Sequence, residues 1–174
     1  MAHDNSLTRE DIEASKRIMG ASGISLAGWD LQHLEDLSGI DLEKVNLVQV
    51  NLQKVDLSGA NLKGVNLEKA NLNQASLAGA DLTGAKLFGA DLGKANLEKA
   101  NLSDCYMGSA DLRGANLDGT NLSNANLHFA DLRGTDLSSA RLTGTNFSEA
   151  KYNRKTKWPN GLRPELTGAL LSSR

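Results

Sequence analysis

The chain contains few of the residues that fill ordinary globular cores. Only 4% of its 174 residues are aromatic, although 40% are hydrophobic. Phe, Tyr and Trp normally contribute much of the buried area of a core. A core without them must be built from small, regularly repeated side chains, and in this sequence those are Leu and Ala.

Cysteine, proline and long apolar runs are also scarce. A single cysteine cannot form an internal disulfide, so nothing indicates an oxidising compartment. No apolar run approaches the roughly 20 residues that span a bilayer. The first 20 residues carry acidic side chains and no uninterrupted apolar core, which is unlike a signal or transit peptide. We therefore expect a cytoplasmic protein that does not associate with membranes.

Strong charge of one sign is absent as well. The net charge of −2 argues against an electrostatic drive toward nucleic acid. Charge is nevertheless divided along the chain, with −4 in 1–39, −3 in 40–149 and +5 in 150–174. The basic end is either a solvated cap or a contact for an acidic partner or nucleic acid, and its cations include Lys151, Arg154, Lys155, Lys157 and Arg163.

What the sequence does contain is a repeat of five residues. From Leu37 to Phe147 an apolar residue recurs at every fifth position, and 21 of these 23 residues are Leu. The exceptions are Met107 and Phe147. The residue two places earlier is Ala in 13 of 22 units, and the residue between them is Asn or Asp in 18 of 22.

A period of five is neither helical nor that of a continuous strand. In a locally extended segment, residues two apart point to the same side, so Ala and Leu face inward and Asn or Asp faces outward. The other two positions are rich in Gly, Ser, Lys, Asn and Glu, several of which favour turns. Each unit is therefore expected to form one short extended edge and one corner.

The pattern, plain in ADLTGAKLFGADLGKANLEKANL, resembles the A(N/D)LXX repeat of the pentapeptide repeat family, including its cyanobacterial members. The resemblance covers roughly two thirds of the chain. It implies an all-β solenoid, a right-handed four-sided β-helix with four units per turn. Nearly six coils at a strand spacing of about 4.8 Å would make a rod roughly 28 Å long.

Both ends of such a rod need caps, because open strand edges invite pairing with other chains. Thr8 followed by acidic residues indicates an N-cap, and we expect a helix from Arg9 to Met19. This helix would lay Leu7, Ile12 and Met19 over the first coil. The earliest units are one residue out of phase with the rest, and Leu34 is expected to absorb the slip.

At the other end the repeat fades after Phe147 and a turn is expected at 159–161. Trp158 is expected to cover the Leu side chains of the last coil, with a ligand-stacking role as the alternative. The predicted organisation is an N-terminal capping helix in 1–23, the β-helix in 24–152 and a C-terminal cap in 153–174.

Candidate catalytic, cofactor and metal sites are not evident. The carboxylates occupy one repeated environment, whereas acid–base pairs need two different ones. His3, His33 and His128 share no spacing that suggests a metal site. Cys105 takes the inward position usually held by Ala, which favours core packing over a reactive thiol. We expect neither an enzyme nor a bound cofactor.

One face of the predicted rod is unusual. With four units per coil, residues 20 apart stack, and the outward aromatic residues of the uninterrupted repeat fall on one side. We call this side the aromatic face; its candidate residues are Val48, Lys86, Phe88, Tyr106, His128 and Phe129. Exposed aromatic residues are enriched at interfaces. The face is predicted to dock a protein partner or a second copy, unless the clustering is chance.

Two functions from different classes follow. The first is a rigid scaffold for protein–protein interaction, since solenoids present extended surfaces. The alternative is a DNA-mimicking inhibitor of DNA gyrase or a protein that protects it, as the family resemblance allows. Mimicry requires a strongly acidic rod, but the repeat region carries only −3. Its unit centres are also nearly all Leu, whereas Phe centres are more typical of those relatives.

Overall fold

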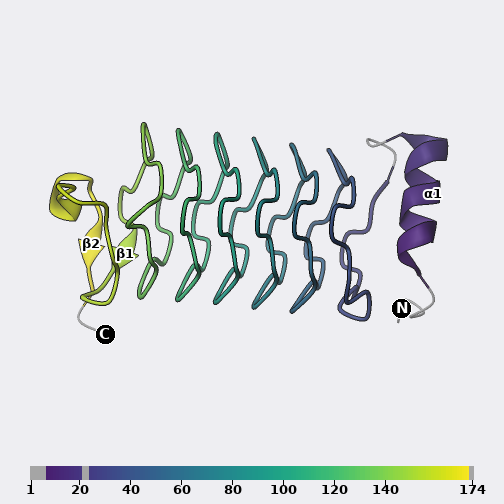
Figure 1. Ribbon diagram of the computed structural model, residues 1–174, viewed down its shortest axis with the longest axis horizontal. Helices are drawn as coiled ribbons and strands as arrows, with labels where there is room; N and C mark the ends of the chain where they lie inside the picture. The colour runs from purple at the N-terminus through teal and green to yellow at the C-terminus, as the bar shows by residue number, and fades with distance from the viewer. Residues whose placement is uncertain (1–6, 21–23, 173–174) are drawn as a thin grey trace.

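The chain forms a rod of stacked coils that is closed at both ends. The computed structural model describes residues 7–20 and 24–172. Helix α1 (Arg9–Met19) lies across one end of the rod (Figure 1). The other end contains β1 (Lys151–Tyr152), the short 3₁₀ helix η2 (Pro164–Leu166) and β2 (Leu170–Leu171).

The coils are held together by parallel pairing between units 20 residues apart. Asn61 pairs with Asp81, and Asp81 pairs with Asn101 in the next coil. The Leu82 N–H donates to the Asn101 carbonyl at 2.8 Å, and the Asn101 N–H donates back to the Ala80 carbonyl at 2.9 Å. Four units therefore complete one turn, which confirms the predicted four-sided β-helix.

The interior consists of the two inward positions of each unit. Leu82 and Leu102 are 0% exposed, as the repeat predicted. Where Thr replaces Ala, its hydroxyl donates to a backbone carbonyl, as Thr120 does to Leu97 at 2.8 Å. Such bonds satisfy buried hydroxyls that would otherwise destabilise the core.

The corners explain the rest of the repeat. The Ala85 N–H donates to the Leu82 carbonyl at 2.8 Å and closes a turn. The second corner residue has a positive φ in every unit from Gly39 to Glu149 except at Ser139. The outward Asn or Asp accepts the backbone N–H two residues later, as Asn96 does from Glu98 at 3.2 Å. This local bond accounts for the preference for Asn and Asp at that position.

The N-terminal cap has the predicted helix. The Thr8 hydroxyl accepts the Asp11 N–H at 3.2 Å, and the Asp11 carboxylate accepts the Thr8 N–H at 2.9 Å, which is a capping box. Ile12 is buried and Leu7 packs against the core. His33 Nε2 donates to the Leu7 carbonyl at 3.0 Å, which ties the cap to the first coil. His3 and the Met19 side chain lie outside the described residues.

The predicted phase slip is present in the first coil. Ser25 pairs with Asn46 and Asp30 with Asn51, which are 21 residues apart, whereas Asp36 pairs with Asp56 at the regular 20. One extra residue is therefore accommodated between these units. Leu34 packs half-buried against the core at this point.

At the C-terminal end the coil continues beyond the recognisable repeat. Asp131 pairs with Lys151 and Asp136 with Lys157, while β2 pairs in parallel with β1. Trp158 packs edge-on against Phe147 and Tyr152, with ring centroids 5.3 and 5.6 Å away. Trp158 thus packs on the last coil, where its ring contacts those of Phe147 and Tyr152. The division at residues 23 and 152 stays a prediction.

Candidate functional site

The aromatic face interrupts a regular column of outward amides. Along this side the paired edge residues are Asn46, Asn66, Lys86, Tyr106, Asn126 and Asn146. Stacked Asn side chains bond to each other elsewhere, as Asn146 Nδ2 donates to Asn126 Oδ1 at 3.1 Å. Lys86 and Tyr106 replace two consecutive amides, and Tyr106 is 59% exposed. The middle of the face therefore carries an exposed ring and a cation in place of hydrogen-bonded Asn side chains.

Phe88 and Gly108 shape the adjoining corner. Phe88 is 51% exposed. Its ring lies over the next coil, because a Cβ atom on Gly108 would meet Phe88 Cδ2 at 3.2 Å. The absence of a side chain on Gly108 thus gives the ring its place along the surface.

These residues surround an open hollow of about 430 Å³. Its lining comprises Glu68, Lys86, Phe88 and Tyr106. Lys86 forms no ion pair with any described residue, so its ammonium is available to a partner. The hollow combines two half-exposed rings with one charge of each sign, which suits an apolar side chain flanked by polar groups.

His128 and Phe129 form a second feature on the same face. Their ring centroids are 4.0 Å apart. His128 Nδ1 lies 2.9 Å from the Ser148 carbonyl oxygen, to which it donates. Phe129 is 53% exposed and occupies the second corner position with φ 60°. This left-handed conformation costs a non-glycine residue about 1–2 kcal/mol, so the fold presents the Phe129 ring at some expense of stability.

The structure brings three of the six predicted residues together around the hollow. These are Lys86, Phe88 and Tyr106, while His128 and Phe129 form a ring pair two coils from Lys86. Val48 is half-buried two coils from Phe88 and belongs to neither. Glu68 was missed by the sequence analysis, although its position one coil before Phe88 in the same column could have indicated it.

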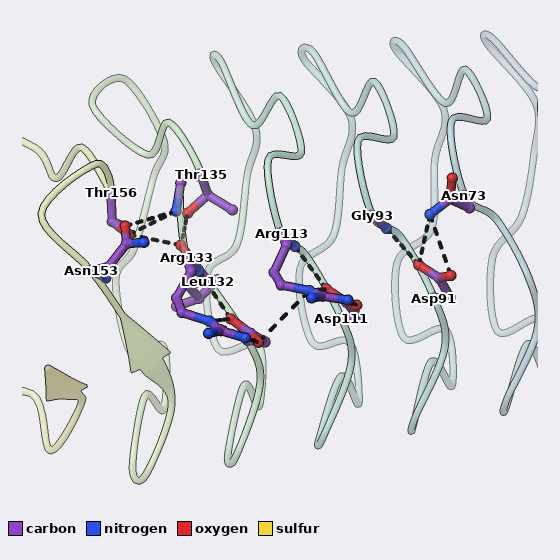
Figure 2. Close-up of polar contacts among 12 residues, drawn as sticks. Asn73, Asp91, Gly93, Asp111, Arg113, Leu132, Arg133, Thr135, Asn153 and Thr156 are labelled. Atoms are coloured by element: carbon purple, nitrogen blue, oxygen red, sulfur yellow. Dashed lines mark hydrogen bonds and ion pairs between the residues drawn. The ribbon is translucent and has the colours of Figure 1, made fainter. Parts of the chain in front are cut away.

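The next unit of each coil forms the side of the rod beside the aromatic face. This side carries a column of aspartates (Figure 2). The Arg113 guanidinium contacts Asp111 at 2.5 Å and lies 3.9 Å from Asp131, while Arg133 contacts Asp131 at 2.6 Å. Partial burial raises the pKa of Asp111, but the bonds from Arg113 outweigh it and hold that pKa below the usual value. The carboxylates of Asp111 and Asp131 are thus neutralised by guanidinium groups of the same chain.

The residues beneath the aromatic face provide no chemistry. Cys105 and Met107 are buried in the core. Cys105 Sγ donates to the Leu82 carbonyl at 2.9 Å, and burial raises the pKa of the thiol to about 12. Among residues 7–20 and 24–172, no three His, Cys, Asp or Glu side chains gather as a metal site would require.

The basic residues of the C-terminal segment are exposed, and one of them is already in an ion pair. Lys157 Nζ contacts Asp136 at 2.7 Å, so this cation is already paired. Lys151 lies on β1, next to the aspartate column, where it pairs through its backbone with Asp131. Within the described part of the chain, none of the helices has the length and apolar character needed to cross a membrane.

The coil geometry defines a solenoid repeat protein of the four-sided β-helix class. A sequence model of pentapeptide repeats matches eight copies, over 36–68, 66–104, 100–138 and 110–148. The chain belongs to the pentapeptide repeat family, whose β-helix is right-handed. No curated protein matches it.

Several solved structures are similar to this chain. The pentapeptide repeat protein Rfr23 from the cyanobacterium Cyanothece 51142 is 31% identical, with 71% of this chain and 91% of that chain covered and a TM-score of 0.38. HetL, involved in heterocyst differentiation regulation in Nostoc sp. PCC 7120, is 26% identical, with coverage of 94% and 92% and a TM-score of 0.32. The fluoroquinolone resistance protein QnrB1 is 19% identical, with coverage of 86% and 90% and a TM-score of 0.45.

Proposed function

We propose that this protein is a non-enzymatic, rigid scaffold for protein–protein interaction, and that the aromatic face is its binding surface. The observation that carries the proposal is the half-exposure of Phe88, Tyr106 and Phe129 on one side of an otherwise polar rod. Monomeric proteins seldom expose grouped aromatic residues without a partner.

The backbone supports this proposal through its rigidity. The Tyr106 edge beneath the face is bonded to the coils on both sides. The Tyr106 N–H donates to the Ala85 carbonyl of the preceding coil at 3.0 Å, and the Met107 N–H donates to the Asn126 carbonyl of the following coil at 2.8 Å. A surface that is ordered before binding loses little conformational entropy when a partner docks. The rings therefore serve as preorganised anchors.

The test is affinity purification from the native cell with a Phe88→Ser/Phe129→Ser variant. Both positions are exposed, so the fold is expected to persist, and partners captured by the wild-type protein should be lost at least tenfold. Leu166→Ser is the matched control, because Leu166 is 77% exposed at the C-terminal end, away from the face. Equal capture by the double variant would rule out the aromatic face.

The gyrase-directed alternative is weakened by the charge pairing described above. A DNA mimic must present a continuous row of unpaired negative charges. Here Asp111 and Asp131 are bound by arginines, and Asp81 is bound by Lys63 at 3.2 Å. A DNA supercoiling assay distinguishes the two functions, and we expect no inhibition or protection of gyrase.

A further inference from the structure

The aromatic face contains both an exposed ring pair and a hollow. The ring pair is His128–Phe129, and the hollow is bounded by Glu68, Lys86, Phe88 and Tyr106. Pairing from Lys86 to Tyr106 and from Tyr106 to Asn126 places them two coils apart on one side of the rod. The coil of Met107 lies midway between them.

We infer that the face binds a second copy of the chain, in an antiparallel side-by-side dimer. The inference rests on the proposed function, because it names the partner of the same surface. A twofold axis across the face at the level of Met107 exchanges the two features. The His128–Phe129 ring pair of each copy then lies against the hollow of the other. Such self-complementarity is what a symmetric dimer interface requires.

The same twofold axis sets which residues the aromatic rings of one copy face in the other. The His128 ring leans toward Ser148, so it lies opposite the Glu68 side of the hollow in the other copy. Phe129 faces Gly89, which has no side chain, and the Lys69 stem runs alongside, with Cγ 3.7 Å from where a Gly89 Cβ would lie. A cation near an aromatic face is favourable. Tyr106 and Gly108 lie at the axis itself, where Gly108 accommodates the Phe88 ring of its own copy.

Charge complementarity supports this register. The exposed Lys69 faces the exposed Glu149 of the second copy, and the contact occurs twice by symmetry. Neither side chain has an ion pair with a described residue. Lys86 faces the Asn126 amide, so no two like charges of the face oppose each other. Moving the axis by one coil, to Leu87, would instead place Lys86 against Lys86.

Charge-reversal variants test the two contacts between Lys69 and Glu149. Lys69→Glu and Glu149→Lys each place like charges together at both symmetric contacts, and each should weaken dimerisation about tenfold. A mixture of the two single variants restores opposite charges at both contacts, as does the double variant. Sedimentation velocity of each protein and of the mixture measures the effect. Dimerisation that is unchanged in both single variants would contradict the pairing.

Cross-linking tests the axis. Ser109 is exposed at the second corner position of the Met107 coil, so Ser109→Cys should form a disulfide-linked dimer under mild oxidation. Lys69→Cys alone should not, since the two copies of that residue would lie four coil spacings apart, about 19 Å. The buried Cys105, whose pKa is raised to about 12, serves as an internal unreactive thiol.

The outcomes separate this inference from the proposed function. A monomer by light scattering at high protein concentration overturns the dimer, as does cross-linking of Lys69→Cys to itself, which would indicate parallel rods. If the wild-type monomer still captures another protein that the Phe88→Ser/Phe129→Ser variant loses, the scaffold function stands and only the inference fails.

Discussion

The Phe88 ring lies across Gly108, the residue that stacks on it one coil later. A Cβ atom on Gly108 would come within 3.2 Å of Phe88 Cδ2, so the ring is in direct contact with the backbone. Gly108 does not have a positive φ, and glycine is therefore not needed there for backbone reasons. Its role is to leave room for a ring that would otherwise be displaced outward.

Gly108→Ala should shift the Phe88 ring by a few tenths of an ångström and narrow the hollow. Because the backbone conformation suits alanine, we expect the free energy of unfolding to change by less than about 0.5 kcal/mol. Self-association should weaken several-fold. Denaturant unfolding and sedimentation velocity measure the two quantities, and a large loss of stability with intact association would contradict this role.

Phe129→Asn should stabilise the protein while weakening association. Asn tolerates the left-handed conformation better than Phe, and Asn124 already holds φ 58° at the same turn position one unit earlier. We expect a gain of about 0.5–1 kcal/mol in the free energy of unfolding. Chemical denaturation measures it. A loss of stability would mean that the ring contact with His128 outweighs the backbone strain.

Leu92→Ala should be strongly destabilising. Leu92 is 0% exposed in the middle of the rod, where neighbouring coils leave little freedom to collapse around a cavity. Comparable substitutions cost about 2.7–5 kcal/mol. Leu166→Ala, at a residue that is 77% exposed, is the control and should change the unfolding free energy by less than about 0.5 kcal/mol. Urea titration of both variants makes the comparison.

The Asp136–Lys157 pair should make stability depend on pH in the acidic range. The hydrogen bond from Lys157, with those from Ser138, lowers the pKa of Asp136 from 3.8 to about 2. A carboxylate with a depressed pKa stabilises the fold above its unfolded value and loses that contribution as pH falls toward its folded value. Stability should therefore decline between about pH 4 and pH 2.

Lys157→Met should flatten this decline, since it removes the largest cause of the lowered pKa. Urea unfolding at several pH values between 2 and 5 measures the profile for both proteins. The contribution is small, because the pair is largely solvated. Identical profiles would show that Lys157 does not hold the pKa of Asp136.

Sequence reasoning predicted the coil well because its signal is local and repeated. The inward positions of Leu82 and Leu102, the helix at Arg9–Met19 and the slip near Leu34 all follow from spacing and capping residues. The pairing of Asp136 with Lys157 was not predicted, because one inserted residue and non-Leu centres conceal the repeat there. Glu68 was missed because a single Glu in a polar column carries no signal in the sequence.

The amino-acid sequence by itself determined which side chains fill the rod and which face outward. The two apolar residues of each five-residue unit stand two apart in an extended segment, so they point to the same side. Only the tertiary structure decided how outward residues meet. Side-chain direction across coils, such as that of Phe88 over Gly108, depends on packing between segments 20 residues apart. Spacing can assign such residues to a side of the rod, but it cannot reveal a hollow and an exposed ring pair two coils apart.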